Sequence, residues 1–319
     1  MRVLVTGASG IVGLNTVEEL LMQGRTIRLF DLPTRKNKRI LKRFGKRADL
    51  RWGDIRRRED LQEAVRDVDA AIHLAAIIPP LADRKPALAE SVNVGGTATL
   101  LACLREANPA ARVLFTSSIS VYGDRVTSPY ISMNDPLTPN PDDHYAHHKI
   151  ECERMIRASG LPFTIFRLSY IVSVRKLGMD PIMFDIPLAT SFEICDSGDA
   201  ALALANAVHD PRVIGETLHI AGGERCRISY RDYLSRMLAI FGVGRPVLPE
   251  RAFRTKGFHC GFMETEKSQS LLHYQRSTLT DYFARVREKT RIKRFFISMV
   301  RAIARQVVFA RSPYLNAAN

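Results

Sequence analysis

The fold is set near the amino terminus by the segment Arg2-Val3-Leu4-Val5-Thr6-Gly7-Ala8-Ser9-Gly10-Ile11-Val12-Gly13. Its apolar beginning is typical of a buried strand, and the apolar spacing that starts at Ile11 is typical of a helix. In the G-x-x-G-x-x-G pattern, Gly7 permits a tight turn, Gly10 lets a pyrophosphate approach the backbone and Gly13 allows close helix packing. A glycine-rich turn without a ligand is the alternative, but the position directly after a strand favours phosphate binding at the helix N-terminus. The predicted ligand-binding residues of this loop are Gly7, Ser9, Gly10, Ile11, Val12 and Gly13.

Short apolar runs alternate with helical patterns through the first half of the chain. The runs are Arg2–Thr6, Thr26–Asp31, Leu50–Gly53, Ala70–Leu74, Arg112–Ser117 and Phe163–Leu168. Between them, a 3.6-residue periodicity predicts helices that include Ile11–Gln23, Ala87–Ala107 and Tyr145–Ser159. Continuous apolar strands that alternate with helices predict a parallel sheet covered on both faces. The predicted fold class is therefore α/β, a Rossmann-type doubly wound parallel sheet.

The pattern loosens after Leu168, which predicts a second, smaller region. Tyr170–Ala189 has no clear periodicity, whereas Asp199–His209 and Tyr230–Phe241 read as helices on either side of a strand at Thr217–Ile220. We assign residues 1–168 and 196–221 to a nucleotide-binding domain, and residues 169–195 and 222–290 to a mostly C-terminal substrate-binding region. Residues 291–319 form a basic amphipathic tail.

Asp31 closes the second predicted strand, 18 residues after Gly13. A carboxylate at this place can accept hydrogen bonds from the ribose diol of an adenosine and repels a 2′-phosphate, which favours NAD over NADP. A turn or N-cap role for Asp31 is the structural alternative. Arg35, Lys36 and Lys38 follow closely and could neutralise a 2′-phosphate, so NADP stays open as a second cofactor.

Tyr145 and Lys149 are four residues apart, so on a helix they share a face one turn apart. An ammonium group stabilises a neighbouring phenolate, and we therefore expect Lys149 to lower the pKa of Tyr145. Tyr145 could then exchange a proton with a substrate hydroxyl or carbonyl while hydride moves to or from a nicotinamide. Ser118 lies at the carboxyl end of a predicted strand, where ligands bind in such sheets, and could hold the reacting oxygen. Turn capping by Ser117 and Ser118 is the structural alternative, and the predicted catalytic residues are Ser118, Tyr145 and Lys149.

A set of motifs accompanies these residues between Arg2 and Phe283. They are Thr6–Gly13, Asp31, Gly53-Asp54-Ile55, His73-Leu74-Ala75-Ala76, Asn93-Val94-Gly95-Gly96-Thr97, Ser117-Ser118 with Tyr122-Gly123, Tyr145 with Lys149, Arg167 and Asp199-Ala200-Ala201. In them the chain resembles the extended short-chain dehydrogenases/reductases, the NAD-dependent epimerase/dehydratase family.

The resemblance implies further cofactor contacts. Asp54 and Ile55 would flank the adenine, Ala75 would line the path of the nicotinamide ribose, and Lys149 would touch that ribose. The remaining cofactor-binding residues that it implies are Leu74, Ala76, Asn93, Ser117 and Tyr145. It also implies a homodimer through the helices at Ala87–Ala107 and Tyr145–Ser159, and a small-molecule substrate.

The resemblance also narrows the set of possible reactions. The family's sugar dehydratases carry an acid within two residues of the position of Ser118, and here Ile119 and Ser120 follow, which disfavours dehydration. Its sugar-nucleotide epimerases carry a diphosphate-binding Arg seven residues before the position of Asp199, where this chain has Phe192.

Two enzyme activities and one non-enzymatic function remain open. The first activity is that of a nucleotide-sugar epimerase, because Arg175, Arg225 or Arg227 could replace the missing clamp. The second is a hydroxysteroid-dehydrogenase-like oxidation or reduction of a less polar alcohol or ketone. A catalytically silent NAD-sensing protein is the third hypothesis, which the presence of all three predicted catalytic residues disfavours.

The net charge of +14 is concentrated in two segments of an otherwise ordinary globular composition, with 46% hydrophobic and 25% charged residues. Residues 35–58 contain twelve Lys or Arg and two acids, and residues 284–311 contain nine and one. Two basic patches on a mildly acidic body are unlike a uniformly basic nucleic-acid binder. No nucleic-acid motif is present, so we predict no nucleic-acid partner.

The second basic segment predicts an amphipathic helix over residues 291–310. Its apolar face comprises Ile292, Phe295, Phe296, Met299, Val300, Ile303 and Val307. Such a helix can lie on an anionic membrane surface. The alternative is that this face packs on the protein body or on a dimer partner.

The remaining features bear on location and metals. Five cysteines without a C-x-x-C pair predict reduced thiols in a cytoplasm. The start at Met1 shows no leader pattern, and no stretch approaches 18 consecutive apolar residues, which predicts a cytoplasmic protein without a spanning helix. His144, His147 and His148 crowd one helix, but no further ligand is evident and we predict no metal site.

Overall fold

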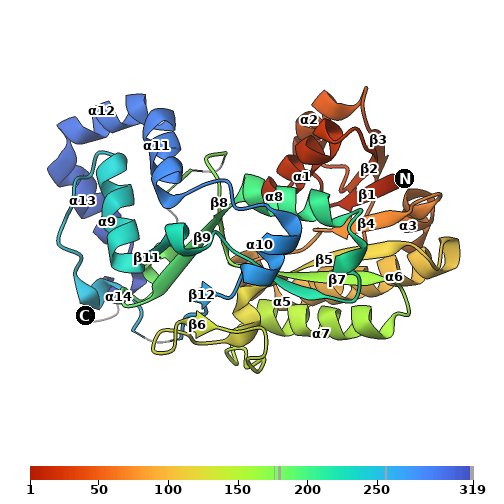
Figure 1. Cartoon of the computed structure of the whole chain (residues 1–319). Coiled ribbons are helices and arrows are strands. Elements are labelled where there is room, and N and C mark those ends of the chain that lie inside the picture. The colour runs from red at the N-terminus through yellow and green to blue at the C-terminus, as the bar shows by residue number, and fades with distance from the viewer. Residues whose placement is uncertain (176, 179–180, 256, 317–319) are drawn as a thin grey trace.

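Seven parallel strands form the central sheet, in the order β10-β7-β5-β4-β1-β2-β3 (Figure 1). This computed structural model describes residues 1–175, 177–178, 181–255 and 257–316. The strands are β1 (Arg2–Thr6), β2 (Thr26–Asp31), β3 (Asp49–Trp52), β4 (Ala70–His73), β5 (Arg112–Ser118), β7 (Phe163–Leu168) and β10 (Thr217–Ile220). The predicted doubly wound parallel sheet is confirmed, and the predicted strand ends differ by one residue at most. Because the strand order reverses between β1 and β4, a crevice opens there at the carboxyl edge of the sheet.

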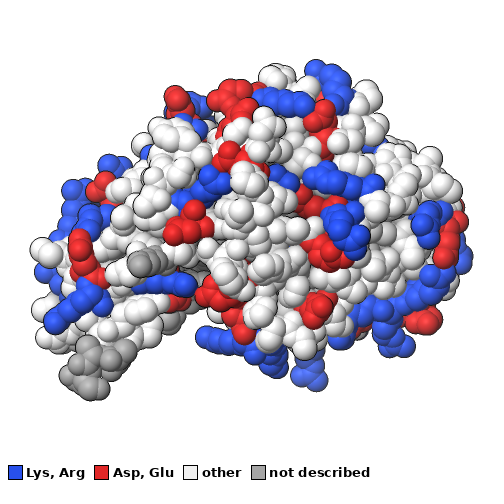
Figure 2. Space-filling view, turned by 90° about the horizontal axis from the view of Figure 1, so that it is seen from below, with Lys and Arg blue, Asp and Glu red and all other residues white. Residues whose placement is uncertain are grey.

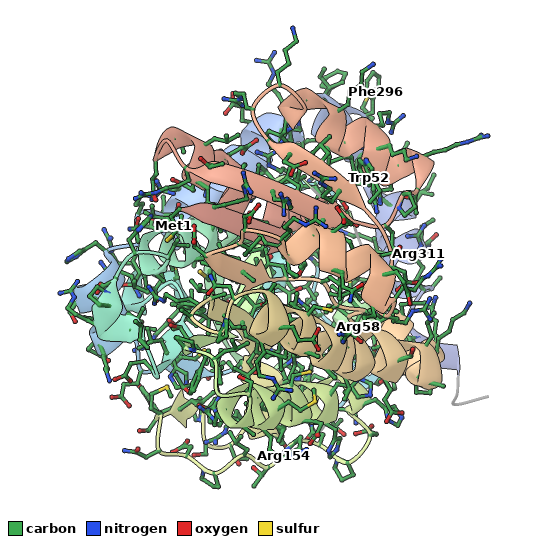
Figure 3. All side chains as sticks on the ribbon, turned by 90° about the vertical axis from the view of Figure 1, so that its right-hand side faces the viewer. Met1, Trp52, Arg58, Arg154, Phe296 and Arg311 are labelled. Atoms are coloured by element: carbon green, nitrogen blue, oxygen red, sulfur yellow. The ribbon has the colours of Figure 1, made fainter. Side chains whose placement is uncertain are left out.

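Helices cover both faces of this sheet. On one face, α1 (Ile11–Met22) packs against α8 (Ser197–Ala207) over a core that includes Leu20 and Leu204. On the other face, α3 (Arg58–Val65), α6 (Gly96–Ala107) and α7 (His144–Ala158) lie side by side (Figure 3). The short helices along the sheet are α2 (Arg35–Leu41), α4 (Leu81–Arg84), α5 (Pro86–Glu90) and α10 (Glu266–Leu272). Strands buried on both faces explain why their sequences read as continuous apolar runs.

A single long helix runs from Pro86 to Ala107, in which α5 and α6 are joined by a π-helical turn at Ser91–Gly95. This helix of 22 residues, with a mean hydropathy of 1.3 in its most apolar window, is long and apolar enough to cross a membrane. The expectation of no such helix rested on uninterrupted apolar runs, and this helix is interrupted by polar residues, with Glu90 among them. In this fold 44% of that window is buried, with α6 on the sheet and against α7, as in helices that cover a parallel sheet.

The smaller lobe surrounds a second sheet with the order β11-β9-β8. These strands are β8 (Tyr170–Val172), β9 (Ser191–Asp196) and β11 (Arg227–Ser229), and the lobe's helices α9 (Tyr230–Ile240), α11 (Leu279–Lys289) and α14 (Pro313–Asn316) surround them. A two-stranded pair, β6 (Tyr130–Ile131) with β12 (Phe262–Met263), lies beside the lobe. The expectation of irregular structure over Tyr170–Ala189 was wrong at β8, because three residues are too few to show a strand periodicity. Lys176, Met179 and Asp180 of that segment lie outside the described residues.

The tail forms two helices, α12 (Arg291–Met299) and α13 (Arg301–Phe309), instead of the one predicted helix. The helical geometry is interrupted at Val300, where φ is −114° and ψ is 34°. The alternative in which the predicted apolar face packs on the body is not found, because Phe295 and Phe296 are exposed and Ile297 packs on the smaller lobe instead. Packing of this face on a dimer partner or on a membrane stays a prediction.

All five cysteines are free thiols and buried. Cys103 and Cys152 lie in the core under α6 and α7, Cys195 lies in the core under α8, and Cys226 and Cys260 lie in the smaller lobe.

Candidate active site

The glycine loop connects β1 to α1 through very close backbone contacts. Gly7 has a left-handed φ of +66°, and a Cβ added there would lie 2.7 Å from the backbone nitrogen of Ala75. A Cβ added to Gly13 would lie 2.5 Å from the carbonyl oxygen of Gly7. Gly10 is the N-cap of α1 and provides no side-chain cap. The first N–H groups of α1 therefore have no capping side chain, which is the arrangement that binds a phosphate.

Asp31 is held beside this loop at the end of β2. Its Oδ2 accepts a hydrogen bond from the backbone N–H of Ser9 at 2.8 Å, and its Oδ1 accepts one from Asn37 Nδ2 at 2.9 Å. Arg35, Lys36 and Lys38 are exposed on α2, which begins four residues later. The carboxylate is thus positioned next to the phosphate loop, while the basic side chains extend into solvent.

Asp54 and Ile55 follow β3 on the same edge. The Oδ2 of Asp54 pairs with Arg56 at 2.5 Å, and hydrogen bonds from Arg56 hold the pKa of that carboxyl below its usual value. Ile55 is buried, and a Cβ added to Gly96 on α6 would lie 2.6 Å from its side chain. Gly96 therefore lets α6 approach the loop that follows β3.

The segment after β4 forms the wall opposite the glycine loop, and Leu74, Ala75 and Ala76 are partly exposed there. The backbone N–H of Ala75 donates to Thr6 Oγ1 at 3.3 Å. Asn93 holds this segment from behind, because its amide oxygen accepts from the N–H of Ile77 at 2.7 Å and its amide nitrogen donates to the carbonyl of Ile77 at 2.9 Å. Both ends of the amide are engaged, so in this structure Asn93 positions the wall.

A buried polar chain that the sequence reasoning did not identify lies beneath this wall. His73 bridges Thr6, whose Oγ1 is 2.8 Å from its Nδ1, and Thr97, whose Oγ1 is 2.9 Å from its Nε2. Burial and the nearby Lys149 ammonium lower the pKa of His73 to about 3, so the imidazole is neutral. The sequence signal was His73 itself, a polar residue inside an otherwise apolar strand.

The three predicted catalytic residues lie on two elements that pack together, β5 and α7. Ser118 ends β5, and its Oγ accepts a hydrogen bond from the N–H of Ser120 at 3.1 Å, while Ser117 beside it is buried. Tyr145 lies in the first turn of α7, which Asp143 caps by accepting from the N–H of Ala146. Lys149 lies one turn further along, and its Nζ is 5.4 Å from the centre of the Tyr145 ring.

Lys149 is buried and has one close polar contact, a hydrogen bond from its Nζ to the carbonyl of Thr116 at 2.6 Å. Burial lowers the pKa of Lys149 to about 8. The expectation that Lys149 lowers the pKa of Tyr145 is not met, because burial and the carboxylate of Asp143 raise that pKa above its usual value of 10. At neutral pH the phenol therefore carries its proton.

A buried ion pair fixes α7 against the sheet. Arg167 on β7 donates to both carboxylate oxygens of Glu153, at 3.0 and 2.7 Å, and Glu153 lies one turn beyond Lys149. Arg167 also donates to Tyr122 Oη at 2.6 Å, which lies 2.6 Å from His219 Nε2. This network holds the helix that carries Tyr145 and Lys149, and among its residues the sequence had drawn attention to Arg167 and Tyr122.

Phe192 occupies the position where a diphosphate-binding Arg was considered, and it is fully buried. Its ring centre lies 4.5 Å from that of Tyr170, 5.3 Å from Tyr230 and 5.1 Å from Tyr233. The position is thus part of the aromatic core of the smaller lobe.

The arginines that could replace such a clamp are mostly paired. Arg175 contacts Glu18 at 2.6 Å, Arg227 contacts Glu193 at 3.1 Å, and Arg225 is exposed. Of the helix histidines, His148 is buried near Asn93, whereas His144 and His147 are exposed. Among the described residues no group of three or more His, Cys, Asp or Glu is arranged to hold a metal ion.

These features fit a dinucleotide. The glycine loop leaves room only for backbone, α1 begins without a side-chain cap, and the Asp31 carboxylate lies beside that loop. The strand order also reverses at this loop, which is where such sheets bind nucleotides. The fold and the site therefore define a nucleotide-binding protein with the extended short-chain dehydrogenase/reductase fold.

Comparison with known proteins gives the family. The model of the NAD dependent epimerase/dehydratase family matches residues 3–183, and the chain belongs to this family. It is 34% identical over 146 residues to a UDP-glucose 4-epimerase of Klebsiella pneumoniae, and the aligned region covers 41% of this chain and 99% of that protein. It is 27% identical over 254 residues to the decarboxylating sterol-4-alpha-carboxylate 3-dehydrogenase of Mus musculus, and the aligned region covers 73% of this chain and 67% of that protein.

A solved structure agrees with this assignment. The dTDP-glucose 4,6-dehydratase of Streptomyces venezuelae, crystallised with NAD, superposes with a TM-score of 0.76 at 26% identity over 93% of this chain and 98% of that one. The prediction of an NAD-dependent family is therefore confirmed. The relatives are an epimerase, a dehydrogenase and a dehydratase, so the comparisons establish the family, and the reaction has to be inferred from the site.

Proposed function

We propose that this protein is an NAD-dependent oxidoreductase or epimerase that transfers hydride at a secondary alcohol or ketone carbon, with Tyr145 as the proton donor and acceptor. The observation that carries the proposal is the placement of Tyr145 and Lys149, one turn apart on α7, against the end of β5 that carries Ser118. This is the carboxyl edge of the sheet that also carries the glycine loop.

The residues that would hold NAD are the glycine loop at the pyrophosphate, Asp31 at the adenosine ribose, and Ala75 with Lys149 at the nicotinamide ribose. When bound, the nicotinamide supplies or accepts the hydride. Tyr145 is protonated at neutral pH, so it can donate its proton to a ketone oxygen during reduction. In the oxidation direction, Tyr145 must first release this proton to solvent, and its phenolate then takes the proton of the alcohol. Ser118 orients that oxygen, and the ammonium of Lys149 stabilises the phenolate that Tyr145 leaves behind.

The smaller lobe favours a substrate without a diphosphate as the second candidate, in the manner of a hydroxysteroid dehydrogenase. Phe192 is core, and Arg175 and Arg227 are neutralised by carboxylates, so two of the three arginines considered as replacements are already engaged. An isolated anionic group is bound most strongly where an unpaired guanidinium faces it. Dehydration stays disfavoured, because Ile119 and Ser120 are buried and neither is an acid.

The assembly and the domain division belong to the same proposal. We propose a homodimer through the exposed sides of the Pro86–Ala107 helix and of α7, in a cytoplasmic enzyme with the domain division given above. Light scattering of the purified protein tests the dimer, and a monomer at micromolar concentration contradicts it.

Replacement of Tyr145 by Phe tests the assignment of the reaction. The Y145F variant is expected to bind NAD like the wild type and to lose turnover by about a hundredfold or more, the usual contribution of an acid–base group. Unchanged turnover contradicts the role of Tyr145.

Mass spectrometry of nucleotide released from the denatured, freshly purified protein separates the two candidates. Near-stoichiometric NAD supports an epimerase that recycles its cofactor. Empty protein whose Tm rises with added NAD supports a dehydrogenase.

A further inference from the structure

The tail is docked on the smaller lobe by one side only. Ile297 and Ala304 pack against the core of that lobe, and Val308 is buried in it. Beyond α13, Ser312 is buried and its Oγ donates to the carbonyl of Ala252 at 2.6 Å. The orientation of α12 and α13 is therefore fixed by the fold, and so is the side that they present to the outside.

That outer side is apolar. Seven large apolar side chains on it are between 49% and 71% exposed, namely Ile292, Phe295, Phe296, Met299, Val300, Ile303 and Val307. We call them the outer face of the tail. Figure 3 shows Phe296 at the outline of the molecule. Elsewhere among the described residues, exposed large apolar side chains are spread along the chain, as in most proteins, whereas a contiguous patch marks an interaction site.

Unpaired cations border the outer face. Arg291 and Lys293 are exposed and project on either side of Ile292, because successive residues on a helix are about 100° apart. Arg311, which follows α13, is exposed as well, whereas the Arg301 side chain lies next to Gly244 of the smaller lobe. Among the described residues, no Lys or Arg between positions 287 and 311 has a carboxylate at ion-pair distance. On the face seen in Figure 2, by contrast, acidic and basic side chains are interspersed.

The positive charge around the outer face favours an anionic lipid surface over a second copy of the chain as its binding partner. In a symmetric dimer the outer face of one chain meets the outer face of the other, so the cations at its borders would approach one another. Residues 284–311 contain one acid, Glu288, to offset this repulsion. An anionic lipid surface meets both requirements at once, because acyl chains accept the apolar side chains and headgroup phosphates accept Lys and Arg. Long cationic side chains at the edges of an apolar face can reach those phosphates while the face is inserted.

We propose that the outer face of α12 and α13 docks on the surface of an anionic lipid bilayer. The inference depends on the tail alone and does not require the reaction proposed above. In Figure 1 these two helices lie at the opposite end of the molecule from β3 and α3. Docking there leaves the glycine loop accessible to cofactor from the aqueous side.

Vesicle sedimentation of the full-length protein at low salt tests the proposal. The probes are vesicles of phosphatidylcholine alone and of phosphatidylcholine mixed with phosphatidylglycerol. The wild type is expected to pellet with the anionic vesicles at least about tenfold more strongly than with the neutral ones, and to be released by salt. The double variants F295S/F296S and R291E/K293E are each expected to lose this binding. Equal pelleting with both kinds of vesicle overturns the proposal.

A matched control removes two exposed apolar side chains of the nucleotide-binding domain, Met22 and Ile214, in the variant M22S/I214S. It is expected to pellet like the wild type, and loss of its binding overturns the assignment to the tail. Point substitutions of exposed residues are preferred to deletion of the tail, because deletion would uncover the core beneath Ile297 and Val308. Circular dichroism checks that each variant is folded. A dimer that F295S/F296S dissociates, without vesicle binding by the wild type, also overturns the proposal.

Discussion

Lys149 should make the stability of the protein depend on pH in a way that a single substitution removes. Its ammonium is buried, 4.5 Å from the centre of the Phe115 ring, and donates one hydrogen bond to Thr116. Burial lowers its pKa from 10.5 to about 8. In the Lys149→Met variant this side chain cannot titrate, while its length and most of its apolar contacts are kept.

The magnitude follows from linkage between protonation and folding. Between pH 8 and 10.5 the unfolded chain still binds the Lys149 proton, whereas the folded chain has released it, so the unfolded state binds more protons. Stability therefore rises with pH across this window. A difference of about 2.5 pKa units, at about 1.4 kcal/mol for each, gives about 3 kcal/mol. The penalty for burying the charge is fully present below pH 8.

Urea unfolding of the cofactor-free wild type and of Lys149→Met at pH 7 and at pH 10.5 measures this difference. The free energy of unfolding of the wild type, relative to the variant, is expected to increase by about 3 kcal/mol between the two pH values. Effects of titrating groups that do not interact with Lys149 cancel in the comparison. The control Lys36→Met changes an exposed side chain and should follow the wild type at both pH values. A difference between wild type and Lys149→Met that stays constant with pH would refute the reasoning.

Three further predictions concern the loop, the ion pair and the cofactor. Gly7→Ala places a Cβ at a φ of +66° and 2.7 Å from the backbone of Ala75, so it should lower the free energy of unfolding in urea. The loss should exceed that of Gly24→Ala, where φ is +69° and nothing lies within 4 Å of the added Cβ. Equal losses of stability contradict the role of the contact with Ala75. Glu153→Gln breaks a buried pair and should cost about 3–5 kcal/mol in the same assay, against less than about 1 kcal/mol for the exposed Glu151→Gln; similar costs contradict the burial argument. Asp31→Ser should shift the ratio of the NAD and NADP dissociation constants at least about tenfold towards NADP in calorimetric titrations, and an unchanged ratio excludes Asp31 as the discriminating group.

The sheet and the phosphate loop were predictable because local sequence determines them. Each strand is an apolar run buried on both faces, and the glycine spacing reflects backbone contacts made within one strand–loop–helix unit. The covering of the sheet on both faces and the place of Asp31 at the end of β2 follow from the same alternation of strands and helices. Tyr145 and Lys149 were recognisable because a helix places residues four apart on one face.

The features of the site and of the tail that the sequence did not predict depend on contacts between segments that are distant in the sequence. The bridge from Thr6 through His73 to Thr97 joins three elements, and no spacing in the sequence shows it. The raised pKa of Tyr145 reflects burial, which the spacing to Lys149 does not contain. In the tail, the apolar face was identified correctly, but which side packs on the body is decided by the shape of the smaller lobe.

The five buried cysteines can report local opening of the core in which each of them lies. A thiol reagent in water can modify a buried cysteine only when the surrounding core opens, so the labelling rate measures the free energy of that opening. Cys103 and Cys152 monitor one layer of the sheet, and Cys195 monitors the other. Cys226 and Cys260 monitor the smaller lobe. Single-thiol variants of the native chain could therefore compare the dynamics of the two lobes without any attached dye.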